Sequence, residues 1–281
     1  MDQELFLIWL YCAIDEAVRS IVRTGRLRAR GAQPELTDAE ALSIELFGET
    51  LGLPSDAAIW RYARAHLHEW FPALGGEWNF VRRCANLHGL KNAILGRVFQ
   101  HGDWEAFDGL PLPVCRLVRA GRDKCFKGEA ASSFCAAKNE YYYGFKAHAL
   151  LNDHDEICGV VLTAANVDER PPLAWLADGG CPLIFADKGL ISAELRAELA
   201  DLGVELVTPL RRNMVDRRPP GQVRLAMRLR RRIETAFGQL VERFGINRTR
   251  GRDFWRWSAR ILRKILAYNF VVRFNNSVQF A

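Results

Sequence analysis

The stretch LIFADKGLIS, residues 183–192, joins a short apolar run to a carboxylate, a cation and a glycine. Residues 183–185 have the composition of a buried strand, and Asp187 follows them after a single alanine. A carboxylate adds nothing to the packing of a core strand, so its position indicates a metal ion, a substrate or a tight turn. The neighbouring elements help to distinguish between a metal site, a substrate site and a turn.

Five short segments have strand patterns, and helical patterns separate the later ones. The first three are close enough in sequence to form an antiparallel meander, and the last two are reached through crossover helices. This order predicts an α/β fold with a mixed five-stranded sheet flanked by helices, in which the first and fourth strands can be neighbours. The predicted strands are residues 104–115, 141–151, 157–163, 183–186 and 204–207.

Residues 1–100 show helical patterns and no sustained strand alternation. Thr37 and Glu40 have the spacing of a capping box, and a single helix is predicted over residues 81–98. We therefore predict a small all-α domain over residues 1–100 that binds DNA ends or a partner subunit. Residues 101–281 would form the α/β domain, including two basic C-terminal helices.

Composition argues against secreted and membrane-spanning classes. The seven cysteines are odd in number and contain no CxxC pair, so we expect reduced thiols in the cytoplasm. The apolar run at residues 5–14 is shorter than the roughly 20 residues that span a bilayer. It follows Asp2 and Glu4 where a signal peptide carries positive charge, so we expect no membrane association.

The charge is distributed unevenly along a chain whose formal net charge is +6. Residues 207–281 hold 18 Lys and Arg against 4 Asp and Glu, and 17 of the 18 cations are arginine. Arginine forms forked hydrogen bonds to phosphate, so this quarter of the chain predicts nucleic-acid binding. A solvated helix face that binds nothing is the alternative.

Three carboxylates lie on elements that can converge. Asp108 is in the first strand, Asp187 ends the fourth, and Glu234 borders the apolar stripe of a long helix. Carboxylates that converge from separate elements can hold the pair of divalent ions used in phosphoryl transfer. Each also has an ordinary alternative. Asp108 can cap a turn at Gly109, Asp187 can form a turn, and Glu234 can pair with a neighbouring arginine on its helix.

Four segments together resemble the successive motifs of insertion-sequence DDE transposases. The region from residue 36 to 87 resembles the helical N-terminal region of one bacterial branch of that family. The resemblance implies a ribonuclease-H-like catalytic domain whose catalytic and metal-binding residues map onto Asp108, Asp187 and Glu234. The four segments are FDGLPLPVCR (107–116), YYYGFKAHALL (141–151), PLIFADKGL (182–190) and RRRIETAFGQLVERFG (230–245).

The resemblance also implies an activity and its partners. The protein would be a DNA transposase that cleaves element ends and transfers them to target DNA, using two divalent ions, Mg²⁺ with Mn²⁺ able to substitute. Its partners would be double-stranded DNA and other copies of the chain, as a homodimer or larger assembly, in the bacterial cytoplasm and at the nucleoid. Many relatives have Tyr seven residues and Arg four residues before the Glu, and Lys seven after it. Here Arg230 matches, but Met227 and Val241 occupy the other two positions.

Six further residues are predicted DNA contacts. Arg230, Arg231 and Arg232 precede Glu234, and Lys188 follows Asp187. Lys146 and His148 share one face of their strand. Solvated helix and sheet faces explain these residues without DNA.

Three other functions remain open for the chain as a whole. The first is a ribonuclease-H-like nuclease that cuts without joining. The second is a non-catalytic DNA-binding protein derived from a transposase, and the third is an interaction module with an incidental basic tail.

Overall fold

The computed structural model describes residues 2–22, 33–136, 138–177 and 180–279. The chain divides into two compact units. The helical unit comprises Met1–Val98, Arg243–Gly245 and Gly251–Ala281, and the sheet unit comprises Phe99–Glu242 and Ile246–Arg250.

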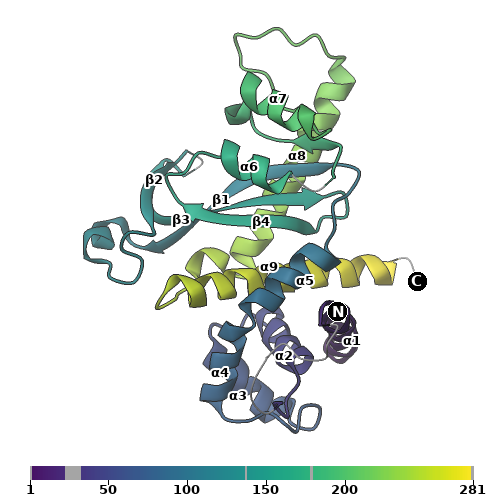
Figure 1. Ribbon diagram of the computed structural model, residues 1–281, viewed down its shortest axis with the longest axis vertical. Coiled ribbons are helices and arrows are strands. Elements are labelled where there is room, and N and C mark those ends of the chain that lie inside the picture. The colour runs from purple at the N-terminus through teal and green to yellow at the C-terminus, as the bar shows by residue number, and fades with distance from the viewer. Residues whose placement is uncertain (1, 23–32, 137, 178–179, 280–281) are drawn as a thin grey trace. The chain divides into compact units, whose positions relative to one another are not determined.

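A mixed sheet forms the centre of the sheet unit, and its strand order is β2-β3-β1-β5-β6, with β4 also paired to β3. β1, β3 and β4 form the predicted antiparallel meander, while β5 and β6 run parallel to β1 (Figure 1). The predicted mixed sheet is confirmed. The strands are β1 (Glu105–Cys115), β2 (Ala131–Cys135), β3 (Glu140–Asn152), β4 (Ile157–Ala164), β5 (Leu183–Phe185) and β6 (Glu205–Val207).

The strand β2 is a sixth strand that was not predicted. Its sequence, ASSFC, is short and consists mostly of small residues, so it carries little strand signal. It pairs with the first part of β3, and β4 pairs with the second part. The partner of β3 changes from β2 to β4 after Gly144, where a Cβ atom would lie 2.2 Å from the carbonyl oxygen of Leu112. Glycine is required there because β1 approaches the backbone of β3 so closely.

Helices cover the two faces of the sheet. On one face, α6 (Arg170–Leu176) and α7 (Ala193–Asp201) pack over a core that includes Phe107 and Ile184. On the other face lies α8 (Pro220–Glu242), behind the sheet in Figure 1. Its buried stripe is Ile233, Ala236, Phe237 and Leu240. Short 3₁₀ turns are η1 (Leu117–Arg122), η2 (Lys188–Leu190) and η3 (Ile246–Arg248).

The helical unit confirms the capping box and corrects one predicted helix. The Glu40 amide donates to Thr37 Oγ1 at 3.1 Å, and the Thr37 amide donates to Glu40 Oε2 at 2.5 Å. The helix predicted over residues 81–98 is wrong in extent, because the chain forms two helices separated at Leu87. Weak helix formers surround this break: Asn86, His88 and Gly89. The first five helices are α1 (Gln3–Ile21), α2 (Asp38–Thr50), α3 (Asp56–His66), α4 (Glu77–Asn86) and α5 (His88–Val98).

The last helix, α9 (Phe254–Gln279), is part of the helical unit. This differs from the predicted extent of the second domain, which included it. The ring of Phe274 meets the ring of Phe6 edge-on at 5.2 Å between centroids. The buried apolar stripe of α9 thus packs against the N-terminal helices. Among the described residues, no helix has the length and apolar character needed to cross a membrane.

Candidate active site

Asp108 lies within β1, opposite Ala149 of β3. Its neighbour Phe107 is part of the core under α6 and α7, so strand alternation turns Asp108 toward the face covered by α8. The Gly109 amide donates to Asp108 Oδ1 at 2.8 Å. Because β1 continues as a strand beyond Gly109, Asp108 does not cap a turn.

Asp187 reaches the same region through the parallel pairing of β1 with β5. Ala106 pairs with Phe185, so Asp108 and Asp187 each lie two residues beyond the last pair of this parallel register. The η2 turn that follows is closed by the Leu190 amide, which donates to the Asp187 carbonyl at 3.0 Å. The Asp187 side chain makes no capping hydrogen bond to this turn. A turn therefore explains the backbone at this position and leaves the carboxylate unexplained.

Glu234 projects from α8, and its side chain is 48% exposed. Arg230, one turn earlier, donates to Glu234 Oε1 at 2.5 Å. The ordinary helix ion pair is thus present. The charge of Glu234 also acts on Asp108, whose pKa it raises. Glu234 therefore lies within electrostatic range of the first carboxylate.

The electrostatics of Asp108 suit a site for a cation. Burial is the main cause that raises the pKa of Asp108 to about 6, and the charges of Glu169 and Glu234 raise it further. The Gly109 amide and Arg230 lower it in part. A buried carboxylate opposed by two other carboxylates gains from a divalent cation, and an all-oxygen donor set suits Mg²⁺.

The three carboxylates have not closed around a common point. Among the described residues, one group of three potential ligand side chains has its atoms within 4.8 Å of one another, and it is a different group. Glu234 is held by Arg230. For all three carboxylates to bind a metal ion together, the Glu234 side chain would have to leave Arg230.

Glu169 is a fourth carboxylate that the sequence reasoning missed. It pairs with Lys146 at 3.1 Å, and a Cβ atom on Gly109 would lie 2.7 Å from Glu169 Oε1. The sequence feature that could have pointed to Glu169 is Gly109, because a glycine inside a central strand indicates that another group approaches closely. Asp168, its neighbour, is exposed and accepts the backbone amide of Arg170 instead.

Two of the predicted DNA contacts are engaged inside the sheet unit. His148 has no exposed surface, and its Nε2 lies 2.9 Å from Thr163 Oγ1. Burial is the main cause that lowers the pKa of His148 to about 4, so it is a neutral core residue at pH 7. Lys146 is paired with Glu169. A fully buried side chain does not reach DNA, so His148 is not carried forward as a contact.

The arginines before Glu234 have different environments. Arg232 binds Asp155 at 2.6 Å and stacks over the Trp104 ring, 4.8 Å from its centroid. Arg231 is exposed, as is Lys188 beside the active site. Further exposed arginines on and before α8 are Arg211, Arg212, Arg217, Arg224 and Arg228.

Comparisons with known proteins bear on the family and on the fold. A family model described as "Transposase DDE domain" matches residues 100–254. A search of curated proteins gives no match. A solved structure of similar fold is the piggyBac transposase in a cryo-EM synaptic complex with hairpin DNA. Its TM-score is 0.53 and its identity 12%, over 99% of this chain and 76% of that one.

The structural likeness shows that the fold is that of a transposase with a ribonuclease-H-like sheet. The family model accounts for more than half of the chain, including β1, β5 and all of α8. The chain therefore belongs to the DDE transposases, enzymes that act on DNA with the help of divalent metal ions.

Proposed function

We propose that this transposase cleaves DNA at the ends of an insertion sequence and joins the freed ends to target DNA. Asp108, Asp187 and Glu234 would be its catalytic and metal-binding residues. One observation supports the assignment: the parallel β1–β5 register ends two residues before both Asp108 and Asp187, and the Asp187 side chain makes no capping hydrogen bond. Glu234 lies within electrostatic range of Asp108.

The proposed cofactors are two Mg²⁺ ions, for which Mn²⁺ can substitute. Asp108, Asp187 and Glu234 would hold the ions. When bound, such ions activate the attacking oxygen and stabilise the leaving oxygen. The fit rests on the oxygen-only donor set and on the unfavourable burial of the Asp108 charge.

Arg230 would position Glu234 and then contact DNA. In the present geometry its guanidinium holds the Glu234 carboxylate, and its buried Nε has no partner among the described residues. Rotation of Glu234 toward Asp108 would release the guanidinium. A freed arginine fork beside the carboxylates is suited to a phosphate of the strand being cut.

DNA would run along the exposed cations of the sheet unit, which include Arg231 and Lys188. The helical unit would bind element ends or a second copy of the chain, in a homodimer or larger assembly on DNA. The protein would act in the bacterial cytoplasm, at the nucleoid when bound.

A cleavage and joining assay tests the proposal. Wild type and Asp187→Asn would be compared on labelled DNA carrying the element ends, with Mg²⁺, Mn²⁺ or EDTA. We expect metal-dependent nicking and joining that the substitution reduces at least about 1,000-fold while DNA binding is unchanged, because the carboxylate acts on the reacting phosphate. Asp201→Asn is the matched control, since this exposed carboxylate ends α7, and it should retain full activity.

Three outcomes would count against the proposal. Cleavage by Asp187→Asn at the wild-type rate would remove the site assignment. Cleavage without joining of a pre-cut end would indicate a nuclease. Salt-sensitive DNA binding without cleavage in any metal would indicate a DNA-binding protein.

A further inference from the structure

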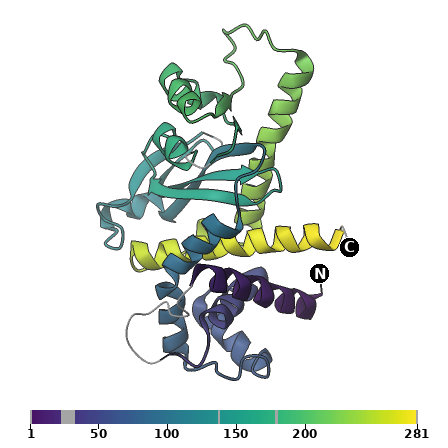
Figure 2. The same ribbon diagram turned by 45° about the vertical axis from the view of Figure 1, so that its right-hand side comes forward.

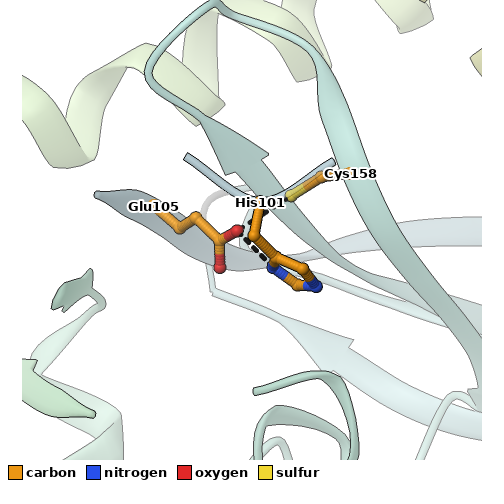
Figure 3. Close-up of side chains that lie close together, drawn as sticks. All are labelled: His101, Glu105 and Cys158. Carbon is orange, nitrogen blue, oxygen red and sulfur yellow. Dashed lines mark hydrogen bonds and ion pairs between the residues drawn. The ribbon is translucent and has the colours of Figure 1, made fainter. Parts of the chain in front are cut away.

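A second group of potential metal ligands lies in the sheet unit, outside the proposed active site. The ligand atoms of His101, Glu105 and Cys158 all lie within 4.8 Å of one another. Glu105 Oε1 is 2.5 Å from His101 Nδ1, and the Cys158 thiol donates to the same oxygen at 3.2 Å (Figure 3). The Cys181 thiol belongs to the same buried core and donates to the Leu183 carbonyl oxygen at 3.3 Å. The Glu105 carboxylate is thus in contact with an imidazole and a thiol, and a second thiol lies in the same core.

The Glu105 carboxylate is incompletely satisfied by these contacts. Its side chain has no exposed surface, yet Oε2 has no hydrogen-bond partner among the described residues. A buried carboxylate oxygen without a partner is costly, and such groups are rare in folded proteins. The pair with His101 accounts for Oε1 alone. The arrangement therefore lacks one positively polarised group next to Oε2.

We propose that His101, Glu105 and Cys158 bind a Zn²⁺ ion, with Cys181 as the fourth ligand. Imidazole, thiolate and carboxylate are the ligands of tetrahedral zinc sites. At zinc–ligand distances of about 2.0–2.1 Å, the nitrogen and oxygen ligands of a tetrahedron lie about 3.3 Å apart. The His101–Glu105 contact would open from 2.5 Å to that separation on binding. Each ligating thiol would release its proton to solvent.

The zinc site and the DDE carboxylates lie on opposite faces of β1. Glu105 and Phe107 alternate with Asp108, and Phe107 belongs to the core under α6 and α7. Cys158 and Cys181 belong to the same core. Sulfur and nitrogen donors also distinguish this site from the all-oxygen one, since they favour zinc over magnesium.

The position of the site indicates a structural role. It would join the segment before β1, the strand β4 and the segment before β5. The strand β1 carries Asp108, and Asp187 lies two residues beyond the end of β5. His101 is 28% exposed and provides an entry path from solvent, whereas Glu105 has no exposed surface. A zinc ion there would hold β1 and β5 in the parallel register that precedes the two aspartates.

Cobalt substitution in the full chain tests the proposal. Metal-free protein would be titrated with Co²⁺ and then with Zn²⁺, and a cobalt–thiolate charge-transfer absorption followed. We expect one such site per chain, with zinc displacing the cobalt. The DDE carboxylates hold no sulfur, so any cobalt bound there gives no such absorption. The readout is therefore independent of the proposed function.

Variants and controls complete the test. Cys158→Ser should abolish the absorption, and zinc affinity should fall by more than the roughly 100-fold that loss of an outer hydrogen-bond partner costs. His101→Gln replaces a partly exposed residue and should weaken zinc at least about 10-fold without unfolding the protein. The matched controls are Cys135→Ser and His154→Gln, which lie outside the cluster and should behave as wild type. A folded wild type without the absorption, or full zinc affinity in His101→Gln, would overturn the proposal.

Discussion

At the scale of single residues, the carboxylate of Asp108 serves the proposed metal site but lowers the stability of the metal-free fold. Its position in β1 is mostly buried, and the charges of Glu169 and Glu234 add to the cost of ionising it. Burial of a charge without a compensating cation destabilises the folded state. A divalent ion bound at the proposed site would supply that compensation.

Asp108→Asn is expected to stabilise the metal-free protein and to abolish cleavage. The folded pKa of about 6 lies above the ordinary value of 3.8, so at pH 7 the ionised carboxylate costs the folded state free energy. Asparagine removes this charge and keeps an acceptor for the Gly109 amide. The gain should be on the order of 1–3 kcal/mol, seen as a higher melting temperature in EDTA. Asp201→Asn should change neither quantity, and a lower melting temperature for Asp108→Asn would contradict this account.

His148 predicts a pH dependence of stability. Burial lowers its pKa from 6.5 to about 4, so between these pH values the unfolded chain binds a proton that the folded protein does not. Stability should therefore fall as the pH drops from 6.5 to 4, by up to about 3 kcal/mol from this residue. His148→Gln should flatten that part of the melting-temperature profile. His154→Gln, which changes a histidine whose side chain is 71% exposed, should leave the slope as in wild type.

At the scale of elements, the two halves of α8 have different surroundings. The C-terminal half buries its apolar stripe against the sheet, and the N-terminal half extends beyond the sheet toward the preceding loop (Figure 2). Arg224, Arg228 and Arg231 are exposed along one face, at positions i, i+4 and i+7. Such a row of forked cations is suited to following a phosphate backbone.

Replacing Arg224, Arg228 and Arg231 by alanine should weaken DNA binding through lost phosphate contacts. Each contact contributes about 0.9 to the slope of log affinity against log salt concentration, so the slope should fall by up to about 3. The triple lysine variant keeps the charges and should retain the slope, with weaker binding only where forked hydrogen bonds matter. Salt titration of DNA binding by fluorescence anisotropy measures the affinity and its salt slope. An unchanged slope in the alanine variant would refute the phosphate contacts.

At the scale of the whole molecule, part of the basic C-terminal sequence is engaged internally. Arg263 of α9 is buried and pairs with Glu45, Glu49 and Asp56 of the N-terminal helices. Lys264 binds Glu49 at 2.6 Å. These cations neutralise buried acids, so they are not available to DNA. The nucleic-acid surface inferred from charge is thereby restricted to the exposed cations.

Arg263→Met should destabilise the helical unit, because it leaves buried carboxylates without their cation. Removing one partner of a buried ion pair costs about 3–5 kcal/mol, so amide exchange in α2 and α9 should become more than about 100-fold faster. Arg256→Met is the control, since its ion pair with Asp253 is at the surface and contributes about 1 kcal/mol at most. Exchange in both helices at the wild-type rate in Arg263→Met would contradict the proposed neutralisation. Mass spectrometry resolves the two helices.

The sequence by itself determined most of the elements and the class of the sheet. Strand periodicity, the capping box at Thr37 and the glycine after the long helix are local signals, and each depends on residues a few positions apart. Asp187 was identifiable for the same reason, because it follows an apolar run directly. The strand β2 was missed because its residues are nearly all small or polar, so only its pairing with β3 makes it a strand.

The tertiary structure alone decided which surfaces meet. An amphipathic pattern shows that a face is buried and does not name its partner, so the sequence did not show what α9 packs against or that His148 is fully buried. The same limit hid Glu169, which reaches Gly109 from a distant segment. It also hid the His101–Cys158 cluster, whose members lie too far apart in sequence to form a motif. Packing brings such groups together through long-range contacts, and no local spacing records them.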